Sequence, residues 1–111
     1  MNDALGDVLG ALADGTRRSV VERLLKGPAT PGELAGQVPI TAQALSRHLS
    51  VLEEAGLIYR TRDGQRRPCH VNPEGLRLAG SWIDQHRAVW EHRFSRLEKH
   101  IASKGEHGNG D

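Results

Sequence analysis

Residues 41–57 have the pattern of one amphipathic helix and read Thr41-Ala42-Gln43-Ala44-Leu45-Ser46-Arg47-His48-Leu49-Ser50-Val51-Leu52-Glu53-Glu54-Ala55-Gly56-Leu57. Leu45, Leu49 and Leu52 recur at helical spacing and predict one buried stripe. Thr41 is a suitable N-cap, because its hydroxyl can accept a hydrogen bond from the free N–H groups of the first turn. Gly56 follows the last periodic residue, where a residue in the left-handed conformation would end the helix.

The opposite face of this predicted helix, residues 41–55, carries Gln43, Ser46 and Arg47. These side chains can hydrogen-bond to base edges or to phosphates. A helix with one apolar face and one hydrogen-bonding face suits insertion into a major groove of DNA. An ordinary amphipathic surface helix would show the same pattern, so the flanking sequence has to decide between the two.

Length and composition narrow the alternatives. A chain of 111 residues forms one domain with a modest core. The formal net charge is only +1, so any nucleic-acid interface must be a local basic patch. One cysteine excludes a disulfide framework within a single chain and fits a reducing cytoplasm. The sequence has no signal-peptide pattern and no long apolar run, so we expect a cytoplasmic protein that does not span a membrane.

A short first helix is predicted near the N-terminus. Leu5, Val8 and Leu12 recur there at three- and four-residue spacing. Gly6 and Gly10 each lower its intrinsic stability by roughly 1 kcal/mol relative to alanine. This helix therefore depends on packing against the rest of its subunit or against a second subunit.

The second predicted helix starts at Asp14-Gly15-Thr16 and ends at Lys26-Gly27-Pro28, where a cation is followed by two residues that terminate helices. Arg17 and Arg18 lie in its first turn, where the helix dipole disfavours positive charge. They are either solvated surface residues or groups held there to bind DNA phosphates.

A third helix is predicted by Thr30-Pro31-Gly32-Glu33, a capping box with proline at the first helical position. This helix is short and ends before Pro39, and two or three residues of turn then lead to Thr41. A short capped helix, a tight turn and a longer helix with a polar face together predict a helix-turn-helix.

After Gly56 the pattern changes to that of a β-hairpin. Residues 57–62 and 66–71 are rich in strand-forming residues, and Asp63-Gly64 is a turn dipeptide between them. Asp63 is the only local acid among the arginines of the hairpin, which are Arg60, Arg62, Arg66 and Arg67. Beside a helix-turn-helix, residues 57–71 are interpreted as a wing that contacts the DNA backbone or a minor groove. The alternative is a solvated edge hairpin that uses its charge to avoid aggregation.

The last helical region is predicted from Asn72-Pro73 to about Ala102, with Gly80 as a candidate break. Apolar and aromatic residues recur along it close to a heptad pattern. Large aromatic side chains on a terminal helix need a partner, and a second copy of the chain is the simplest one. We therefore predict one domain over residues 1–102 that forms a homodimer. A disordered tail is expected over residues 103–111, which contain three glycines and no apolar residue.

With these elements in place, the sequence resembles the ArsR/SmtB family of bacterial winged-helix repressors. The resemblance covers about residues 10–75 and is carried by residues 12–18, 32–35, 45–58 and 62–67. It implies a mainly α fold with a small β-hairpin, arranged as a winged helix-turn-helix of four helices, two strands and a fifth helix. It also implies a homodimer through the first and last helices, which would bind a palindromic operator in double-stranded DNA.

The resemblance assigns roles to residues in four sets. Base edges would be contacted by Ala42, Gln43, Ser46 and Arg47. The helix-turn-helix would be positioned on the DNA backbone by Arg17, Arg18, Thr30, Thr41 and His48. The alternative for His48, in a helix that begins at Thr41, is packing against the second helix. The wing would bind phosphates through Arg62, Arg66 and Arg67. The dimer interface would comprise Leu5, Val8, Leu12, Trp82, Ile83, His86, Trp90, Phe94, Leu97 and Ile101.

The end of the chain resembles the aromatic-rich branch of the family that lacks the usual metal sites. The Cys-x-Cys pair of one type of metal sensor is absent from residues 20–25. A second type places ligands on the last helix, where this chain keeps Asp84, His86 and His100 but has Leu97 at the fourth position. Zinc prefers four protein ligands in a closed site. We therefore expect no bound metal or other cofactor, and a zinc-responsive repressor remains the alternative.

The predicted function is that of a DNA-binding transcriptional repressor, and autoregulation is a hypothesis. A winged-helix adaptor for proteins is a rival, although such an adaptor would not need a basic wing. The sequence contains no phosphate-binding loop, zincin motif or nucleophile elbow, so we do not expect an enzyme. Cys69 alternates with Val71 on the predicted return strand, which favours a buried apolar filler over a redox sensor.

Overall fold

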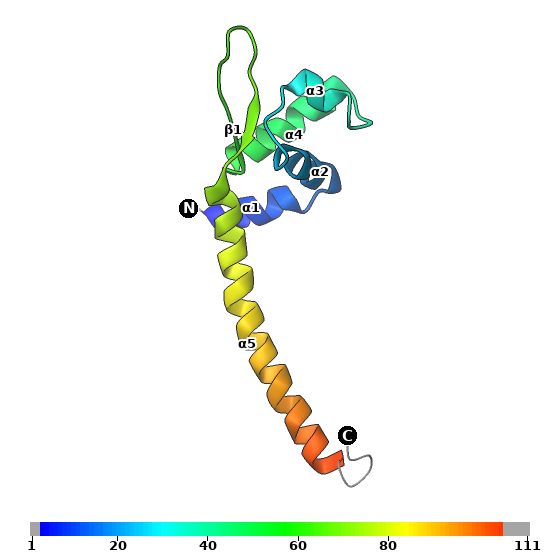
Figure 1. Ribbon diagram of the computed structural model, residues 1–111, viewed down its shortest axis with the longest axis vertical. Coiled ribbons are helices and arrows are strands. Elements are labelled where there is room, and N and C mark those ends of the chain that lie inside the picture. The colour runs from blue at the N-terminus through cyan, green and yellow to red at the C-terminus, as the bar shows by residue number, and fades with distance from the viewer. Residues whose placement is uncertain (1–2, 106–111) are drawn as a thin grey trace. The chain divides into compact units, whose positions relative to one another are not determined.

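The computed structural model of the chain describes the backbone of residues 3–105 and the side chains of residues 3–101 (Figure 1). The elements follow the predicted order, and they are α1 (Ala4–Leu12), α2 (Gly15–Leu24), α3 (Pro31–Ala35), α4 (Ala42–Glu54), β1 (Ile58–Arg60), β2 (Cys69–Val71) and α5 (Pro73–Gly105). The chain divides into two compact units, one up to Ala79 and one from Gly80 onward.

Side-chain caps start the four helices that precede the hairpin. Asp3 accepts a hydrogen bond from the backbone N–H of Gly6 at 2.8 Å, which stabilises the glycine-containing α1. Asp14 caps α2 in the same way. The capping box predicted at Thr30 is present at the start of α3. Thr41 caps α4 through a 3.1 Å hydrogen bond from the N–H of Ala44, as predicted.

The core of the first unit lies between these helices and the hairpin. The leucine stripe predicted for α4 is confirmed, because Leu45, Leu49 and Leu52 are all buried. Full burial of one such side chain is worth about 1.5–3 kcal/mol, so this stripe fixes which face of α4 remains for other contacts. Val8 is also buried in this core, with 1% of its surface exposed. Its expected place in a dimer interface is therefore corrected, because its side chain is already covered within its own chain.

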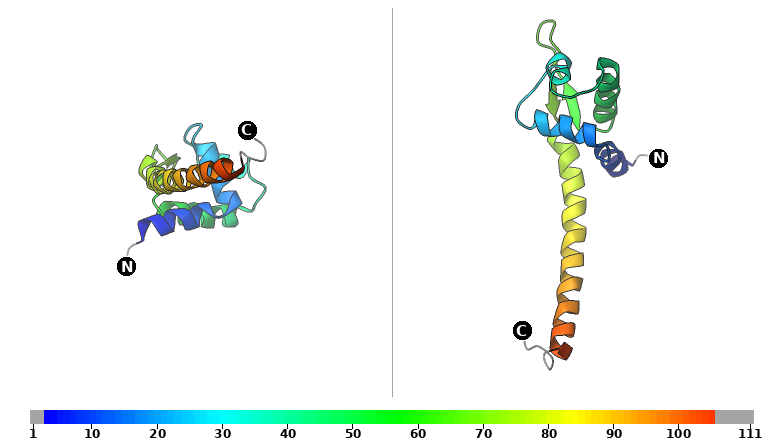
Figure 2. Two further views of the ribbon diagram at one scale, coloured as in Figure 1. Left: turned by 90° about the horizontal axis from the view of Figure 1, so that it is seen from below. Right: turned by 90° about the vertical axis from the view of Figure 1, so that its right-hand side faces the viewer.

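The hairpin is antiparallel, with Tyr59 opposite His70 in its register. Its two strands have three residues each and are shorter than the predicted strands 57–62 and 66–71. Pro68 explains the difference, because a proline has no N–H with which to continue the ladder of hydrogen bonds. Toward the tip, paired backbone hydrogen bonds between Asp63 and Arg66 close a turn in which Gly64 has a φ of 65°. The hairpin tip projects past α3 in the view of Figure 1 and in the right-hand view of Figure 2.

A short bridge joins the loop before α3 to the hairpin. Ala29 and Cys69 exchange backbone hydrogen bonds of 2.7 and 3.2 Å, so this loop pairs with β2. The bridge fixes the base of the wing to the segment that leads into the helix-turn-helix. Gly56 follows α4 with a φ of 82°, in the left-handed conformation predicted for it.

The second unit consists of α5 beyond Ala79. The candidate break at Gly80 is wrong, since the helix continues through it to Gly105. A glycine costs a helix only about 1 kcal/mol, which the rest of a long helix can offset. The helix also extends three residues past its expected end near residue 102, and the remainder of the predicted tail lies outside the described residues. Within residues 3–105 we find no helix whose length and apolar character would allow it to cross a membrane.

Candidate nucleic-acid interface

The outer face of α4 carries the residues predicted to contact base edges. Ala42, Gln43, Ser46 and Arg47 are all exposed, and they lie opposite the buried leucine stripe. Thr41 is exposed as well, although its hydroxyl already caps the helix. The burial of one face of α4 thus leaves a short polar face that could enter a groove of DNA.

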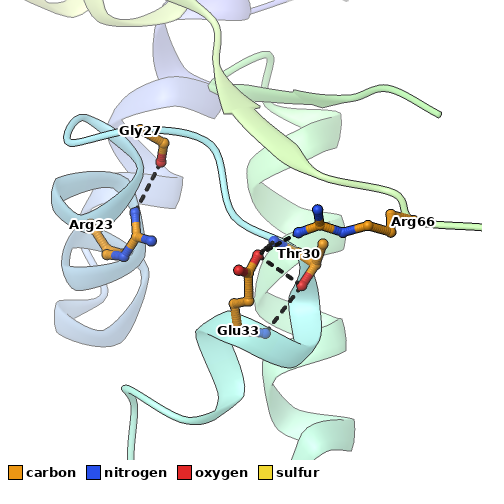
Figure 3. A network of polar contacts seen from close by, with 5 residues as sticks. All are labelled: Arg23, Gly27, Thr30, Glu33 and Arg66. Carbon is orange, nitrogen blue, oxygen red and sulfur yellow. Dashed lines mark hydrogen bonds and ion pairs between the residues drawn. The ribbon is translucent and has the colours of Figure 1, made fainter. Parts of the chain in front are cut away.

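The helix before the turn is held by a network around Glu33 (Figure 3). One carboxylate oxygen of Glu33 accepts the backbone N–H of Thr30 at 2.8 Å and the hydroxyl of Thr30 at 3.1 Å. Nη2 of Arg66, on the wing, approaches the same oxygen to 3.2 Å. The N-terminal end of α3 and the tip of the wing therefore share one anionic group. Thr30, which was predicted to contact the DNA backbone, is half-buried and caps α3.

The charge of Glu33 is favoured by these contacts. The backbone N–H and then the hydroxyl of Thr30 lower the pKa of its carboxyl below the ordinary value of 4.5, and the positive charges of Arg66 and Arg23 lower it further. Glu33 is thus an anion at neutral pH. Sequence reasoning identified its capping role but missed its pairing with the wing, because no local pattern connects residues 33 positions apart.

The four arginines of the hairpin are not equivalent. Arg60 lies at its base, where its Nε is 3.4 Å from a carboxylate oxygen of Glu53 and its side chain is only 17% exposed. Arg66 pairs with Glu33, so an acid from α3 offsets the wing in addition to the local Asp63. Arg62 and Arg67 are exposed. Within the described residues, unpaired and exposed positive charge on the wing is therefore concentrated at Arg62 and Arg67, whereas Arg66 is exposed but paired with Glu33.

Arg17 and Arg18, predicted as phosphate ligands, point their guanidinium groups at the C-terminal end of α1. Arg18 donates to the carbonyl oxygen of Leu12 at 2.7 Å and remains exposed. Arg17 donates to the carbonyl oxygens of Ala11 at 2.7 Å and Gly10 at 3.2 Å. Its third contact is with Nδ1 of His48 on α4, at 3.3 Å. Both His48 and Arg17 are half-buried, so their roles are at least partly structural.

Cys69 is buried on β2, as the strand pattern predicted. Desolvation raises the pKa of its thiol above the ordinary value of 9.0. A buried thiol with a raised pKa is a poor nucleophile, which favours the packing role. On the other face of the hairpin, the rings of Tyr59 and His70 stack at 4.9 Å, a cross-strand contact that the sequence analysis did not predict.

Two of the three candidate metal ligands on α5, His86 and Asp84, have other partners. Nδ1 of His86 lies 2.8 Å from the carbonyl oxygen of Trp82 and donates to it, and Asp84 pairs with Arg87 at 3.1 Å. In the part of the chain that the structure describes, no three His, Cys, Asp or Glu side chains gather in a way that could hold a metal ion.

The residues predicted for a dimer interface are divided between the two units. Leu5 and Leu12 of α1 are half-buried in the first unit. On α5, the predicted apolar residues and their neighbour Val89 remain exposed, and they are Trp82, Ile83, Val89, Trp90, Phe94, Leu97 and Ile101. His86 is exposed and stacks on the ring of Trp82.

A capped helix, a tight turn, a second helix with an exposed polar face and an adjoining basic hairpin define a winged helix-turn-helix domain, which is a DNA-binding module. Comparison with known proteins supports this class. A family model described as a helix-turn-helix domain matches residues 12–59. The HTH-type transcriptional regulator Rv2034 of Mycobacterium tuberculosis is 40% identical over 96 residues, which are 86% of this chain and 87% of that protein. The transcriptional repressor SdpR of Bacillus subtilis is 30% identical over 79 residues, which are 71% of this chain and 88% of SdpR.

Solved structures agree with these relatives. The ArsR family transcriptional regulator RHA00566 superimposes with a TM-score of 0.72 at 34% identity, covering 79% of this chain and 91% of that one. The homodimeric winged helix-turn-helix DNA-binding domain Mb0332 of Mycobacterium bovis gives a TM-score of 0.64 at 25% identity, over 78% of this chain and 80% of that one. The chain therefore belongs to the ArsR family of winged-helix transcriptional regulators, and it is a DNA-binding regulator of transcription.

Proposed function

We propose that this protein is a homodimeric transcriptional repressor whose α4 helices read the two halves of a palindromic operator. The observation that carries the proposal is the exposed polar face of α4 beside a wing with accessible arginines. Repression is supported by the similarity to SdpR, and dimerisation by the similarity to the homodimeric Mb0332 domain. The protein would act by occupying a promoter and not by catalysis.

The base-reading roles follow from the chemistry of the side chains on α4. Arg47 can donate two hydrogen bonds to a guanine, and Gln43 can form a bidentate pair with an adenine. Ser46 can bond to either type of base edge, and the methyl group of Ala42 can touch a thymine methyl. Each good bidentate pair is worth about 1–3 kcal/mol of discrimination between bases.

Phosphate contacts would come from the exposed cations around this face. Arg62 and Arg67 hold the wing on the backbone, and Arg66 joins them when its pairing with Glu33 is shared or released. Arg18 and Thr41 are the further candidates near the helix-turn-helix. Such contacts fix the register of the protein on the duplex, whereas the residues of α4 select the sequence.

Dimerisation would bury the exposed apolar row of α5. This row contains both tryptophans and the single phenylalanine of the chain, and Trp90 is 65% exposed. Large exposed apolar surfaces mark sites of association. We propose that residues 1–102 act together as one DNA-binding and dimerisation domain.

The test is binding of the full chain to a labelled duplex from upstream of its own gene, titrated across salt, with zinc or with a chelator. We expect selective binding that weakens steeply with salt, because phosphate contacts release counterions, and no response to zinc. The Arg47→Ala variant should lose about 1–3 kcal/mol and relax its sequence preference. The matched control is Arg77→Ala, which removes an exposed arginine paired with Glu74 on α5 and should bind like the wild type.

Other outcomes would favour the rival functions. No binding to DNA at low salt, together with a salt-insensitive interaction with a protein, would favour the adaptor. Release of the duplex by zinc would favour a metal site that includes Asp84, His86 and His100. Equal loss in the Arg47→Ala and Arg77→Ala variants would mean that α4 does not read the bases.

A further inference from the structure

The guanidinium group of Arg17 joins two helices. Its Nε and Nη2 donate to the carbonyl oxygens of Ala11 and Gly10, which belong to the last turn of α1. Carbonyl groups at a helix C-terminus lack their usual partner within the helix. Arg17 donates to that of Ala11, and it adds a second donor to that of Gly10, which also accepts the backbone N–H of Ala13 at 3.2 Å. Its Nη1 reaches Nδ1 of His48 on α4 at 3.3 Å. One side chain of α2 thus connects the end of α1 to the helix that carries the base-reading face.

The direction of the contact between Arg17 and His48 is fixed by chemistry. A guanidinium is always charged and can only donate hydrogen bonds, so Nδ1 of His48 has to accept. The backbone of Arg17 is held as well, because its N–H donates to the carboxylate of Asp14 at 3.0 Å. Arg17 is therefore held at both ends, and its guanidinium has little freedom to turn toward a phosphate.

His48 follows Arg47 directly on α4 and lies two residues after Ser46. A contact to His48 therefore restrains the rotation of α4 about its own axis, next to the side chains that would reach base edges. We propose that Arg17 is a positioning residue of the DNA interface. Its hydrogen bonds link the C-terminal end of α1 to His48 and so fix the position of the base-reading face of α4. This inference rests on the proposed role of that face, and it replaces direct phosphate binding by Arg17.

Arg18 provides a matched control. It is the next residue on α2, it carries the same charge, and it also donates to a carbonyl oxygen at the end of α1, that of Leu12. It is more exposed than Arg17, and it has no hydrogen bond to α4 among the described residues. A phosphate ligand and a positioning residue are expected to respond differently to the same substitution, so the two neighbours can be compared directly.

The experiment measures Kd for the operator and for an unrelated duplex across salt, with Arg17→Gln and Arg18→Gln, and monitors folding by circular dichroism. We expect Arg17→Gln to lose about tenfold in the ratio of operator to unrelated DNA, with an unchanged salt slope. We expect Arg18→Gln to keep that ratio. Retention of the ratio in Arg17→Gln, with a salt slope reduced by about one, would identify a phosphate ligand and overturn the proposal.

Variants of His48 keep the test decisive if Arg17→Gln does not fold. His48→Gln retains an oxygen that can accept from Arg17, whereas His48→Leu does not. We expect selectivity to survive in His48→Gln and to fall about tenfold in His48→Leu. Equal loss in both variants would contradict the link. The double variant Arg17→Gln/His48→Leu should be no worse than either single variant, because the two changes remove one interaction.

A readout without DNA separates this inference from the proposed function. The 15N resonance of Nδ1 in His48 reports whether this atom accepts a hydrogen bond. It should shift in Arg17→Gln and not in Arg18→Gln. Suppose that the resonance shifts in Arg17→Gln only, but that the wild type binds all duplexes equally well. The proposed function would then be wrong, and the link between Arg17 and His48 would still be supported. An unshifted resonance in Arg17→Gln would overturn the link itself.

Discussion

Nη2 of Arg66 lies 3.2 Å from Oε1 of Glu33, so the tip of the wing is paired with the capping box that starts α3. The same oxygen accepts both the N–H and the hydroxyl of Thr30. A single carboxylate therefore supports the first helix of the helix-turn-helix and restrains the wing beside it. Its negative charge is required for the pairing with Arg66 and strengthens the hydrogen bonds of the cap, so both contacts are sensitive to acid.

The first prediction concerns this acid sensitivity. The N–H and hydroxyl of Thr30, followed by Arg66 and Arg23, lower the pKa of Glu33 in the folded chain below 4.5. A carboxyl whose pKa falls on folding adds stability above its unfolded pKa and loses it as pH falls through its folded pKa. We expect Glu33→Gln, which can still form a capping box, to unfold at lower urea than the wild type at pH 6. The difference between their urea midpoints should shrink below about pH 4.5. A difference that stayed constant down to pH 3 would show that the charge of Glu33 contributes nothing.

The second prediction concerns Gly75, in the first turn of α5. A Cβ atom at this position would lie 2.4 Å from the carbonyl oxygen of Gly56 and 3.1 Å from Cα of Leu57. Both neighbours are backbone atoms, so the clash cannot be relieved by turning a side chain. We expect Gly75→Ala to lower the free energy of unfolding by about 1–3 kcal/mol, as overpacking does.

Gly80 is the matched control for Gly75, because it lies in the same helix and a Cβ there would meet open space. Gly80→Ala should raise stability by up to about 1 kcal/mol through helix propensity. Urea denaturation of the two variants measures both effects. A stable Gly75→Ala variant would mean that the start of α5 can move away from the turn after α4.

Local interactions explain which features could be predicted from sequence. The caps at Thr30 and Thr41 and the left-handed Gly56 involve residues close together in the chain, so their patterns are visible in the sequence. The leucine stripe of α4 is likewise a matter of spacing. Because the leucine stripe is buried, the opposite, polar face of α4 remains exposed, and this is the face that was predicted to read DNA. The relatives confirm the family of the chain.

Contacts between distant residues could not be predicted from the sequence. A cation in the first turn of a helix suggested either a solvated residue or a phosphate ligand at Arg17, and no local pattern indicated that its guanidinium donates to carbonyl oxygens at the end of α1. Val8 was expected at the dimer interface and lies in the core of its own chain. The residues that Arg17 and Val8 contact come from other helices, so the spacing of residues within one helix does not predict these contacts.

The third prediction concerns Cys69, whose side chain is buried and whose thiol has a pKa raised by desolvation. Thiol reagents react with the thiolate, so both burial and the raised pKa slow the reaction. We expect the native protein to react with a colorimetric disulfide reagent far more slowly than the protein unfolded in guanidinium. A variant with Cys69→Ala and Ser81→Cys, which moves the thiol to an exposed position of α5, should react at once. Rapid reaction of native Cys69 would restore the redox-sensor hypothesis.

The last prediction concerns the exposed apolar row of α5. Trp90 and Phe94 stack at 6.2 Å with 65% and 48% of their surfaces exposed, which is the kind of aromatic pair that anchors an interface. A charge at Phe94 would have to be buried without a partner in a dimer, so Phe94→Glu should weaken dimerisation by about 2 kcal/mol or more, roughly thirtyfold in Kd. His92 lies outside the exposed apolar row of α5, so His92→Glu introduces the same charge there and should leave the dimer intact. Sedimentation of both variants over a range of concentrations measures the effect. A wild-type chain that remained monomeric at the highest concentration would show that α5 does not hold two copies together, and a single subunit could then contact only one half of a palindromic operator.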